Sequence, residues 1–234
     1  MRRRRPYAAA GAALQAVLVL VWLIGWPIRW MIYSPGPAAD ALFYTNWNWF
    51  MSGLFFLIAW PSLLCLPACD SVLHLLFFTT LVFSNAVTFV GGMLVVAENA
   101  TLLTGSTAAW STVFLGERVV HVLGPLFVLL YALLRLNDLK WIWQGHAHAA
   151  RVACGPCTGT CTVASVLLLQ LALPWIPLLC YRAFLSVLGA DYYAVYTAST
   201  LSLAGALLTG VTCMITFQCV VMCCRPRGTL RSGE

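Results

Sequence analysis

Residues 71–96 read SVLHLLFFTTLVFSNAVTFVGGMLVV, a continuous apolar run in which His74 is the only ionisable side chain. A helix that crosses a membrane needs about 20 consecutive and mostly apolar residues, because each residue adds about 1.5 Å along the helix axis. The run does not alternate between polar and apolar residues, and a backbone inside hydrocarbon must satisfy its own hydrogen bonds. A membrane-spanning helix, rather than a strand, is therefore predicted here.

The rest of the chain has the same character. Of its 234 residues, 62% are hydrophobic and 9% are charged, and the mean hydropathy is +0.88. About a quarter of the residues in a soluble domain are charged, so this composition excludes a soluble globular protein. We expect an all-α transmembrane helix bundle that forms a single integral membrane domain over residues 1–234. The predicted bundle has about six spanning helices, at residues 7–33, 43–66, 71–96, 118–140, 162–185 and 193–223.

Charged residues give this bundle a direction. If the N-terminus is cytoplasmic, ten cationic residues fall on the cytoplasmic side and three on the outer side. Cytoplasmic flanks of membrane helices carry an excess of Lys and Arg, so both termini are predicted to be cytoplasmic. Topology also accounts for the net charge of +6, and no nucleic-acid partner is expected. We favour an endomembrane or the plasma membrane as the location, with an organellar inner membrane as the alternative. The ten residues are Arg2, Arg3, Arg4, Arg5, Arg135, Lys140, Arg151, Arg225, Arg227 and Arg231.

Polar residues gather at the start of the second predicted helix. The segment LFYTNWNWF, residues 42–50, places Thr45, Asn46 and Asn48 among bulky aromatic side chains. Polar groups at that depth need hydrogen-bond partners. One interpretation is an interfacial aromatic belt whose Asn and Thr side chains bond to neighbouring helices. The other is a functional site.

A second candidate group opens the fourth predicted helix, GERVVHVLGPLFVLLYALL at residues 116–134. Glu117 and His121 are four residues apart and share one helix face, where the carboxylate could orient the imidazole. Ionisable groups in a membrane segment are functional candidates. The alternative is that His121 only bonds a neighbouring helix, while Glu117 pairs with Arg118 at the surface.

The start of this helix decides whether the two groups can meet. If it begins near Arg118, His121 lies at about the same depth as Thr45, and the two residues could share one site. If it begins at Trp110, His121 lies about 16 Å deep, near the midplane. We favour the later start, because charged residues are easier to place at an interface than in hydrocarbon.

In three features the chain resembles the androgen-induced-gene-one and rolling-stone superfamily of six-helix membrane proteins. These are the hydrophobic chain with six spans, the F-x-T-N-W-like segment at residues 43–47, and a histidine followed closely by proline and apolar residues at 121–130. The androgen-induced branch consists of atypical hydrolases of lipid esters, the fatty acid esters of hydroxy fatty acids, which use a membrane-embedded Thr and His. The resemblance implies that Thr45 and His121 have these roles. Other branches have no such established chemistry, so the resemblance alone does not make the chain an enzyme.

The chemistry of such a site follows from these residue types. The Thr45 hydroxyl becomes a nucleophile only when a base such as His121 removes its proton, and Glu117 could orient that base. The side-chain amides of Asn46 and Asn48 are candidate donors to the oxyanion. The bilayer would deliver an acyl-chain substrate, and no cofactor is expected. The alternatives are a non-catalytic accessory or structural subunit bound to other membrane subunits and, less favoured, a transporter, for which a row of ionisable residues across the bilayer would be expected.

Ten cysteines raise the question of metal or redox chemistry. The segment between the fourth and fifth predicted helices contains Cys-Gly-Pro-Cys, but the strand-to-helix context of a thioredoxin-like motif is missing. The same segment offers enough ligands for a tetrahedral zinc, yet cysteines beside a membrane are as easily acylated or simply tolerated, so no metal is predicted. The candidate ligands are His146, His148, Cys154, Cys157 and Cys161.

Two kinds of covalent modification are also indicated. Asn99 lies in an Asn-Ala-Thr tripeptide on the predicted outer side and is a candidate for glycosylation. Cys223 and Cys224 lie beside Arg225 at the end of the last predicted helix and are candidates for palmitoylation.

Overall fold

The computed structural model describes residues 8–32, 44–65, 67–98, 122–188 and 200–223. Every regular element in these ranges is a helix. Residues 122–123 are π-helical and lead into α7. In chain order the helices are α1 (Ala8–Ile32), α3 (Tyr44–Cys65), α4 (Pro67–Glu98), α7 (Gly124–Leu134), α8 (Leu136–Ala172), α9 (Trp175–Val187) and α11 (Thr200–Cys223).

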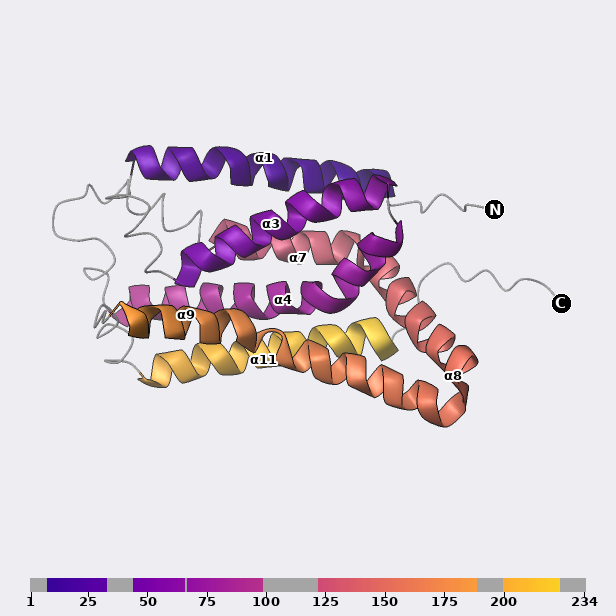
Figure 1. Cartoon of the computed structure of the whole chain (residues 1–234). Coiled ribbons are helices and arrows are strands. Elements are labelled where there is room, and N and C mark those ends of the chain that lie inside the picture. The colour runs from indigo at the N-terminus through magenta and orange to yellow at the C-terminus, as the bar shows by residue number, and fades with distance from the viewer. Residues whose placement is uncertain (1–7, 33–43, 66, 99–121, 189–199, 224–234) are drawn as a thin grey trace.

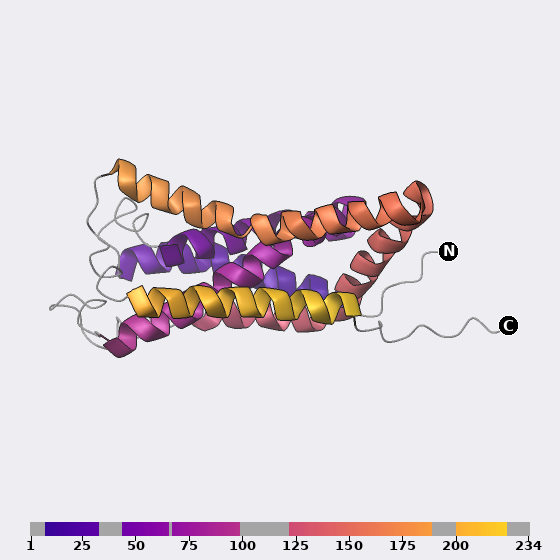
Figure 2. The ribbon, with the colours of Figure 1, turned by 90° about the horizontal axis from the view of Figure 1, so that it is seen from below.

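Most of these helices lie along one direction and form a bundle (Figure 1). The start of α1 and the end of α11 lie at the same end of the bundle, which agrees with an even number of passes between them. At that end α8 extends away from α7, turns, and returns towards α9 (Figures 1 and 2). Which side of a membrane this end faces stays a prediction.

Helix α4 occupies the centre of the bundle. It packs against α3, α7, α8 and α11, while α1 packs on the outside against α3 and α7. In an apolar 18-residue window of Ser71–Met93 in α4, 61% of the residues are buried, compared with 17% in such a window of Thr162–Val187 and 28% in one of Ala204–Cys223. The polar side chains of α4 therefore face other helices, whereas the later helices turn most of their apolar surface outward.

Small residues bring α4 and α11 close together. A Cβ atom at Gly210 would lie 2.5 Å from Val87 Cγ2, so no larger residue fits there without a shift. Gly91 faces Ala206 in the same interface, at 3.6 Å for the equivalent atom. Glycine and alanine are typical of tightly packed membrane helices, because they let the backbones approach.

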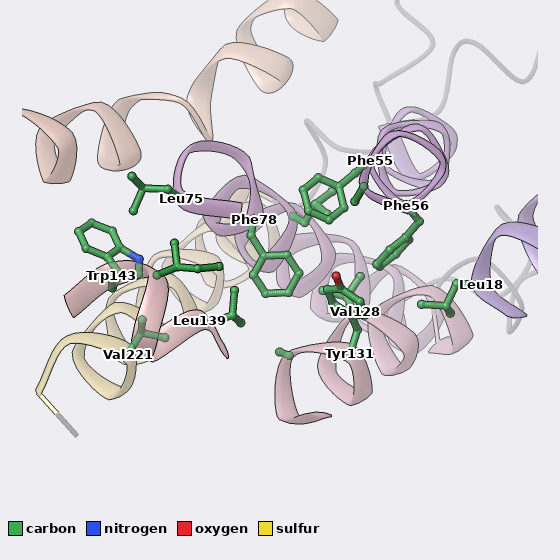
Figure 3. Close-up of a cluster of buried hydrophobic side chains, with 14 of the residues drawn as sticks. Leu18, Phe55, Phe56, Leu75, Phe78, Val128, Tyr131, Leu139, Trp143 and Val221 are labelled. Atoms are coloured by element: carbon green, nitrogen blue, oxygen red, sulfur yellow. The ribbon is translucent and has the colours of Figure 1, made fainter. Parts of the chain in front are cut away.

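Aromatic rings fill the core between α3, α4 and α7. Phe56 and Tyr131 pack edge to face with ring centroids 5.0 Å apart, and Phe55 lies 5.7 Å from Phe78. Figure 3 shows these four rings together, with the Tyr131 hydroxyl directed towards the phenylalanines. Leu18 of α1 and Val221 of α11 close the same cluster at its edges.

Three stretches within the described residues are long and apolar enough to cross a membrane: Ser71–Met93, Thr162–Val187 and Ala204–Cys223. Large apolar side chains are exposed on the last two, as at Leu168, Leu179 and Leu208. The hydroxyl group of the exposed Thr212 donates to the Leu208 carbonyl at 2.8 Å. This polar group therefore has a hydrogen-bond partner within its own helix and needs no water. These apolar helices indicate a membrane protein.

The helix boundaries differ from the hydropathy pattern mainly after Leu134, while α4 begins four residues earlier than predicted and the predicted helix over residues 162–185 is divided between α8 and α9. The sequence predicted one helix over residues 118–140 and a connection up to residue 161. In the structure α7 ends at Leu134, and α8 continues as a helix through that segment to Ala172. The segment HAHAARVA, residues 146–153, is too polar to count as a membrane span, yet its alanines favour a helix. Hydropathy therefore marked the end of an apolar stretch and not the end of a helix.

Candidate functional site

The first turns of α3 carry the three polar residues singled out in the sequence, and all three are buried. Thr45, Asn46 and Asn48 are 7%, 3% and 2% exposed. Thr45 and Asn48 are three residues apart, so they are neighbours along one face of the helix. This face meets α4, on which further polar side chains lie.

Asn85 of α4 is the centre of the resulting hydrogen-bond network. Its amide nitrogen donates to the Leu81 carbonyl at 2.9 Å and to Ser52 Oγ at 3.1 Å. Its carbonyl oxygen Oδ1 accepts a hydrogen bond from Asn48 Nδ2 at 3.1 Å. Tyr44 and Ser84 add a second link between the helices, with 2.9 Å between their hydroxyl oxygens. We call Tyr44, Thr45, Asn48, Ser52, Ser84 and Asn85 the α3–α4 polar cluster.

This network determines the orientation of the side-chain amides of Asn48 and Asn85. The Leu81 carbonyl can only accept, so the atom of Asn85 beside it must be the nitrogen. The atom of Asn85 that faces Asn48 is then the oxygen, and Asn48 must present its nitrogen to it. The carbonyl oxygen Asn48 Oδ1 is left on the other side, buried and without a hydrogen-bond partner. Buried acceptors are normally paired with a hydrogen-bond donor, so this unpaired oxygen requires an explanation.

Aromatic side chains enclose the cluster. The ring of Tyr44 lies 5.3 Å from that of Tyr181, and the ring of Trp47 lies 5.7 Å from Tyr181 and 5.5 Å from Phe184. These contacts bring the C-terminal half of α9 against the start of α3. These rings therefore border the cluster at Tyr44.

The start of α7 packs against the same cluster. A Cβ atom at Gly124 would lie 3.3 Å from the Trp49 ring and 3.7 Å from Asn85 Oδ1. Gly124 follows His121 by three residues in the sequence. His121 and Glu117 themselves lie outside the described residues, as do Asn99 and Cys224. Their predicted roles stay predictions.

A second polar cluster, which the sequence did not predict, surrounds Arg135 at the junction of α7 and α8. The Arg135 side chain is 1% exposed. Its Nη1 donates to Tyr131 Oη at 3.0 Å and to His74 Nε2 at 3.3 Å, and Nε and Nη2 each lie 3.4 Å from Asp138 Oδ2.

Tyr131 connects this cluster to the rest of the bundle. Its hydroxyl oxygen lies 2.7 Å from His74 Nε2 of α4 and 3.4 Å from Gln15 Oε1 of α1. Gln15 in turn donates to the Phe56 carbonyl of α3 at 3.2 Å. We define the Arg135 cluster as Gln15, His74, Tyr131, Arg135 and Asp138. It connects α1, α4, α7 and α8, and Gln15 also bonds α3.

The sequence contained a signal for this cluster that composition alone did not reveal. Tyr131 and Arg135 are four residues apart, on one face of a helix, and Asp138 follows one turn later. In the sequence Arg135 counted only as a cytoplasmic flanking charge. Its partner His74 lies 61 residues earlier in the chain, and Gln15, which bonds Tyr131, lies 116 residues before that tyrosine.

The described side chains give little support to the predicted zinc ligands and acylation sites. His146 has a buried Nε2 atom without a hydrogen-bond partner. The side chains of His148, Cys154, Cys157 and Cys161 lie outside the described set, and within that set no three His, Cys, Asp or Glu residues gather as a metal site would require. Cys223 is an exposed free thiol at the last residue of α11.

Comparisons of the chain with protein-family models, with curated proteins and with solved structures find no match. The resemblance to the androgen-induced-gene-one and rolling-stone superfamily therefore depends on the three features of the sequence described above.

Proposed function

We propose that this chain is a membrane-embedded hydrolase of lipid esters, with Thr45 as nucleophile and His121 as base, and that it belongs to the androgen-induced-gene-one and rolling-stone superfamily. The observation that carries the proposal is the buried α3–α4 polar cluster. Thr45 is buried on the same face of α3 as Asn48 of this cluster, and a Cβ atom at Gly124, three residues after His121 in the sequence, would lie 3.7 Å from Asn85 Oδ1. This contact supports a meeting of the Thr45 and His121 segments at one depth.

The reaction has two halves. Thr45 Oγ attacks the carbonyl carbon of the ester while His121 takes the hydroxyl proton and passes it to the oxygen of the departing alcohol. An acyl group is left on Thr45, and water then releases it as a carboxylic acid. The Asn48 amide nitrogen donates to Asn85, and the side-chain amides of Asn46 and Asn48 are the candidate oxyanion donors.

The surroundings of Thr45 suit a lipid substrate. The aromatic wall of Tyr44, Trp47, Tyr181 and Phe184 is apolar enough to accept an acyl chain. A substrate dissolved in the bilayer can reach such a site sideways, so no water-facing substrate domain is needed. Membrane lipids are therefore the expected partners.

The proposal is tested by hydrolysis of 4-nitrophenyl laurate by the purified protein in phospholipid nanodiscs. Thr45→Ala and His121→Ala should each lower turnover by about 10²-fold or more, since each removes a group needed for proton transfer or acyl transfer. Thr80→Ala is the matched control, because Thr80 is a buried threonine of α4 outside the cluster. Full activity of either site variant would exclude the proposed roles.

A non-catalytic role as a structural or accessory membrane subunit is the second candidate. It is favoured by the interhelical bonds from Asn85 to Asn48 and Ser52, which hold α3 and α4 together without any chemistry. On this reading the protein would co-purify with partner subunits in stable ratios, and no activity-based serine or threonine hydrolase probe would label it. Labelling of Thr45 would rule it out as the sole function.

A further inference from the structure

We infer that α9 is a lateral gate, which swings about Pro174 and opens a path from the lipid to the α3–α4 polar cluster. The inference deepens the proposed function and rests on it for the identity of the molecule that passes, a lipid dissolved in the bilayer. Its starting point is a change along one apolar span, which makes buried amide hydrogen bonds before Pro174 and ring contacts after it.

The span Thr162–Val187 is broken near its middle. It is divided into α8 and α9, and the ribbon changes direction between them (Figures 1 and 2). Pro174 has no N–H group to donate to the carbonyl four residues earlier. The Ile176 amide donates to the Leu173 carbonyl, three residues earlier, at 3.1 Å. A helix whose regular hydrogen bonds are interrupted by a proline can bend there, so this break provides a hinge.

The part of the span before the hinge is anchored to the bundle. Gln170, four residues before Pro174, is fully buried, and its side-chain nitrogen donates to the Leu75 carbonyl of α4. Its side-chain oxygen accepts a hydrogen bond from Gln218 of α11 at 3.0 Å. Such bonds are costly to break inside a membrane, because hydrocarbon offers neither partner a replacement. The end of α8 therefore stays with α4 and α11 when α9 moves.

The part after the hinge packs on the bundle through aromatic rings. Trp175 lies 5.3 Å from Phe83 of α4 between ring centroids, and Tyr181 and Phe184 contact the rings of α3 described above. Lipid tails are as apolar as these rings, so no hydrophobic driving force holds the rings against α3 and α4. These ring contacts can therefore be exchanged for lipid at a lower cost than the hydrogen bonds of Gln170.

Helix α9 lies between the outer surface of the bundle and the cluster. Leu179 and Val187 are exposed on one side of α9, whereas Tyr181 is buried on the other. Tyr181 packs on Tyr44, whose hydroxyl oxygen lies 2.9 Å from that of Ser84. When α9 swings outward, lipid takes the place of Tyr181 beside the ring of Tyr44. A molecule in the bilayer then reaches the hydroxyl groups of the cluster from the side.

The gate is tested without an ester, by the rate at which a buried thiol reacts with N-ethylmaleimide, a reagent that enters the bilayer. Ser84→Cys places the thiol in the cluster beside Tyr44. The matched control is Ala132→Cys, in the buried α7 part of the other hydrophobic core. The full-length variants are studied in phospholipid nanodiscs, and peptide mass spectrometry separates each new adduct from those of the natural cysteines. The thiol of Ser84→Cys should react about tenfold faster than that of Ala132→Cys.

Two changes in the gate should move this rate in opposite directions. Phe184→Ala removes the ring contact with Trp47 and should raise the reaction rate of Ser84→Cys about tenfold. Pro174→Ala returns the missing N–H group to the helix and should lower that rate about threefold. Neither change should alter the rate of Ala132→Cys by more than about twofold. Pro174→Ala also tests the gate if Phe184→Ala does not fold.

Two results would overturn the gate. Equal acceleration of Ser84→Cys and Ala132→Cys by Phe184→Ala would show that the whole bundle opens. No response of Ser84→Cys to either change in the gate would show that α9 is a fixed wall.

The inference and the function on which it rests fail separately. If the reaction of Ser84→Cys follows the α9 variants but the protein does not hydrolyse 4-nitrophenyl laurate, the gate is supported and the proposed function has failed. If the ester is hydrolysed at a rate that Phe184→Ala and Pro174→Ala leave unchanged, and the two buried thiols react equally slowly, the proposed function is supported and the gate is overturned.

Discussion

The α3–α4 polar cluster and the Arg135 cluster are both buried against α4, yet they differ in charge and in completeness. The Arg135 cluster contains a guanidinium and a carboxylate, and Arg135 donates to three different side chains. The α3–α4 polar cluster is built from amides and hydroxyls, and it leaves Asn48 Oδ1 without a partner. The charged groups, whose burial costs more free energy, are thus paired, while the neutral cluster keeps one acceptor without a partner.

This difference bears on the roles that the two clusters can have in the interior of the bundle. An unpaired buried charge destabilises the fold, so the paired network of Arg135 is best explained as a set of bonds that hold the helices together. An orphan neutral acceptor can be tolerated, and it offers a ligand something to bind. Ionisable residues in a membrane are usually the first candidates for function, whereas the site that we propose lies at the uncharged cluster.

The largest expected effect is on stability and comes from Arg135→Met. The substitution leaves the Asp138 carboxylate buried without its cation and removes a donor from both His74 and Tyr131. We expect the free energy of unfolding to fall by about 3–5 kcal/mol. Titration of the reconstituted protein with a denaturing detergent would measure this change.

The control for this experiment is Arg182→Met, since Arg182 is exposed on α9. It should change the free energy of unfolding by no more than about 0.5 kcal/mol. Equal effects of the two substitutions would show that the Arg135 cluster does not tie the helices together.

An intermediate effect is expected when one hydroxyl is removed from each cluster. Tyr131→Phe takes away the oxygen that Arg135, His74 and Gln15 share, and it should lower the free energy of unfolding by about 1–3 kcal/mol. Tyr44→Phe removes the bond to Ser84 and should lower it by about 0.5–1.5 kcal/mol. A larger loss for Tyr44→Phe would reverse the comparison of the clusters.

The smallest effect on stability is expected for Asn48→Leu. The substitution deprives Asn85 Oδ1 of its donor, but it also removes the unpartnered Asn48 Oδ1 from the interior. The two changes oppose each other, so the free energy of unfolding should change by about 1 kcal/mol or less. A loss above that for Tyr131→Phe in the same titration would mean that Asn48 is mainly a structural residue.

The sequence was most informative where the hydrophobic run and the helix have the same ends. Residues 7–33 and 43–66 were predicted as helices, and α1 and α3 begin and end within about one residue of these bounds. The predicted polar site also lies in a buried position, because Thr45, Asn46 and Asn48 stand among aromatic residues that pack against other helices.

The sequence was least informative about contacts between distant segments. Arg135 follows an apolar run, as flanking cations do, but its partners include His74 of α4, and its other partner Tyr131 also bonds Gln15 of α1. The free oxygen of Asn48 is likewise decided by Leu81 and Asn85, through two hydrogen bonds that no local pattern encodes. The pairing of Thr45 with His121 stays a prediction, since His121 lies outside the described residues.

The central position of α4 also has a consequence for the order in which the chain assembles as it leaves the ribosome. Asn85 finds its partners on α3, which is synthesised earlier, so the α3–α4 hairpin can close on itself within the insertion machinery. His74, on the same helix, bonds Tyr131 and Arg135, which are synthesised later. The imidazole of His74 therefore gains its bonds to Tyr131 and Arg135 only after α7 has been synthesised.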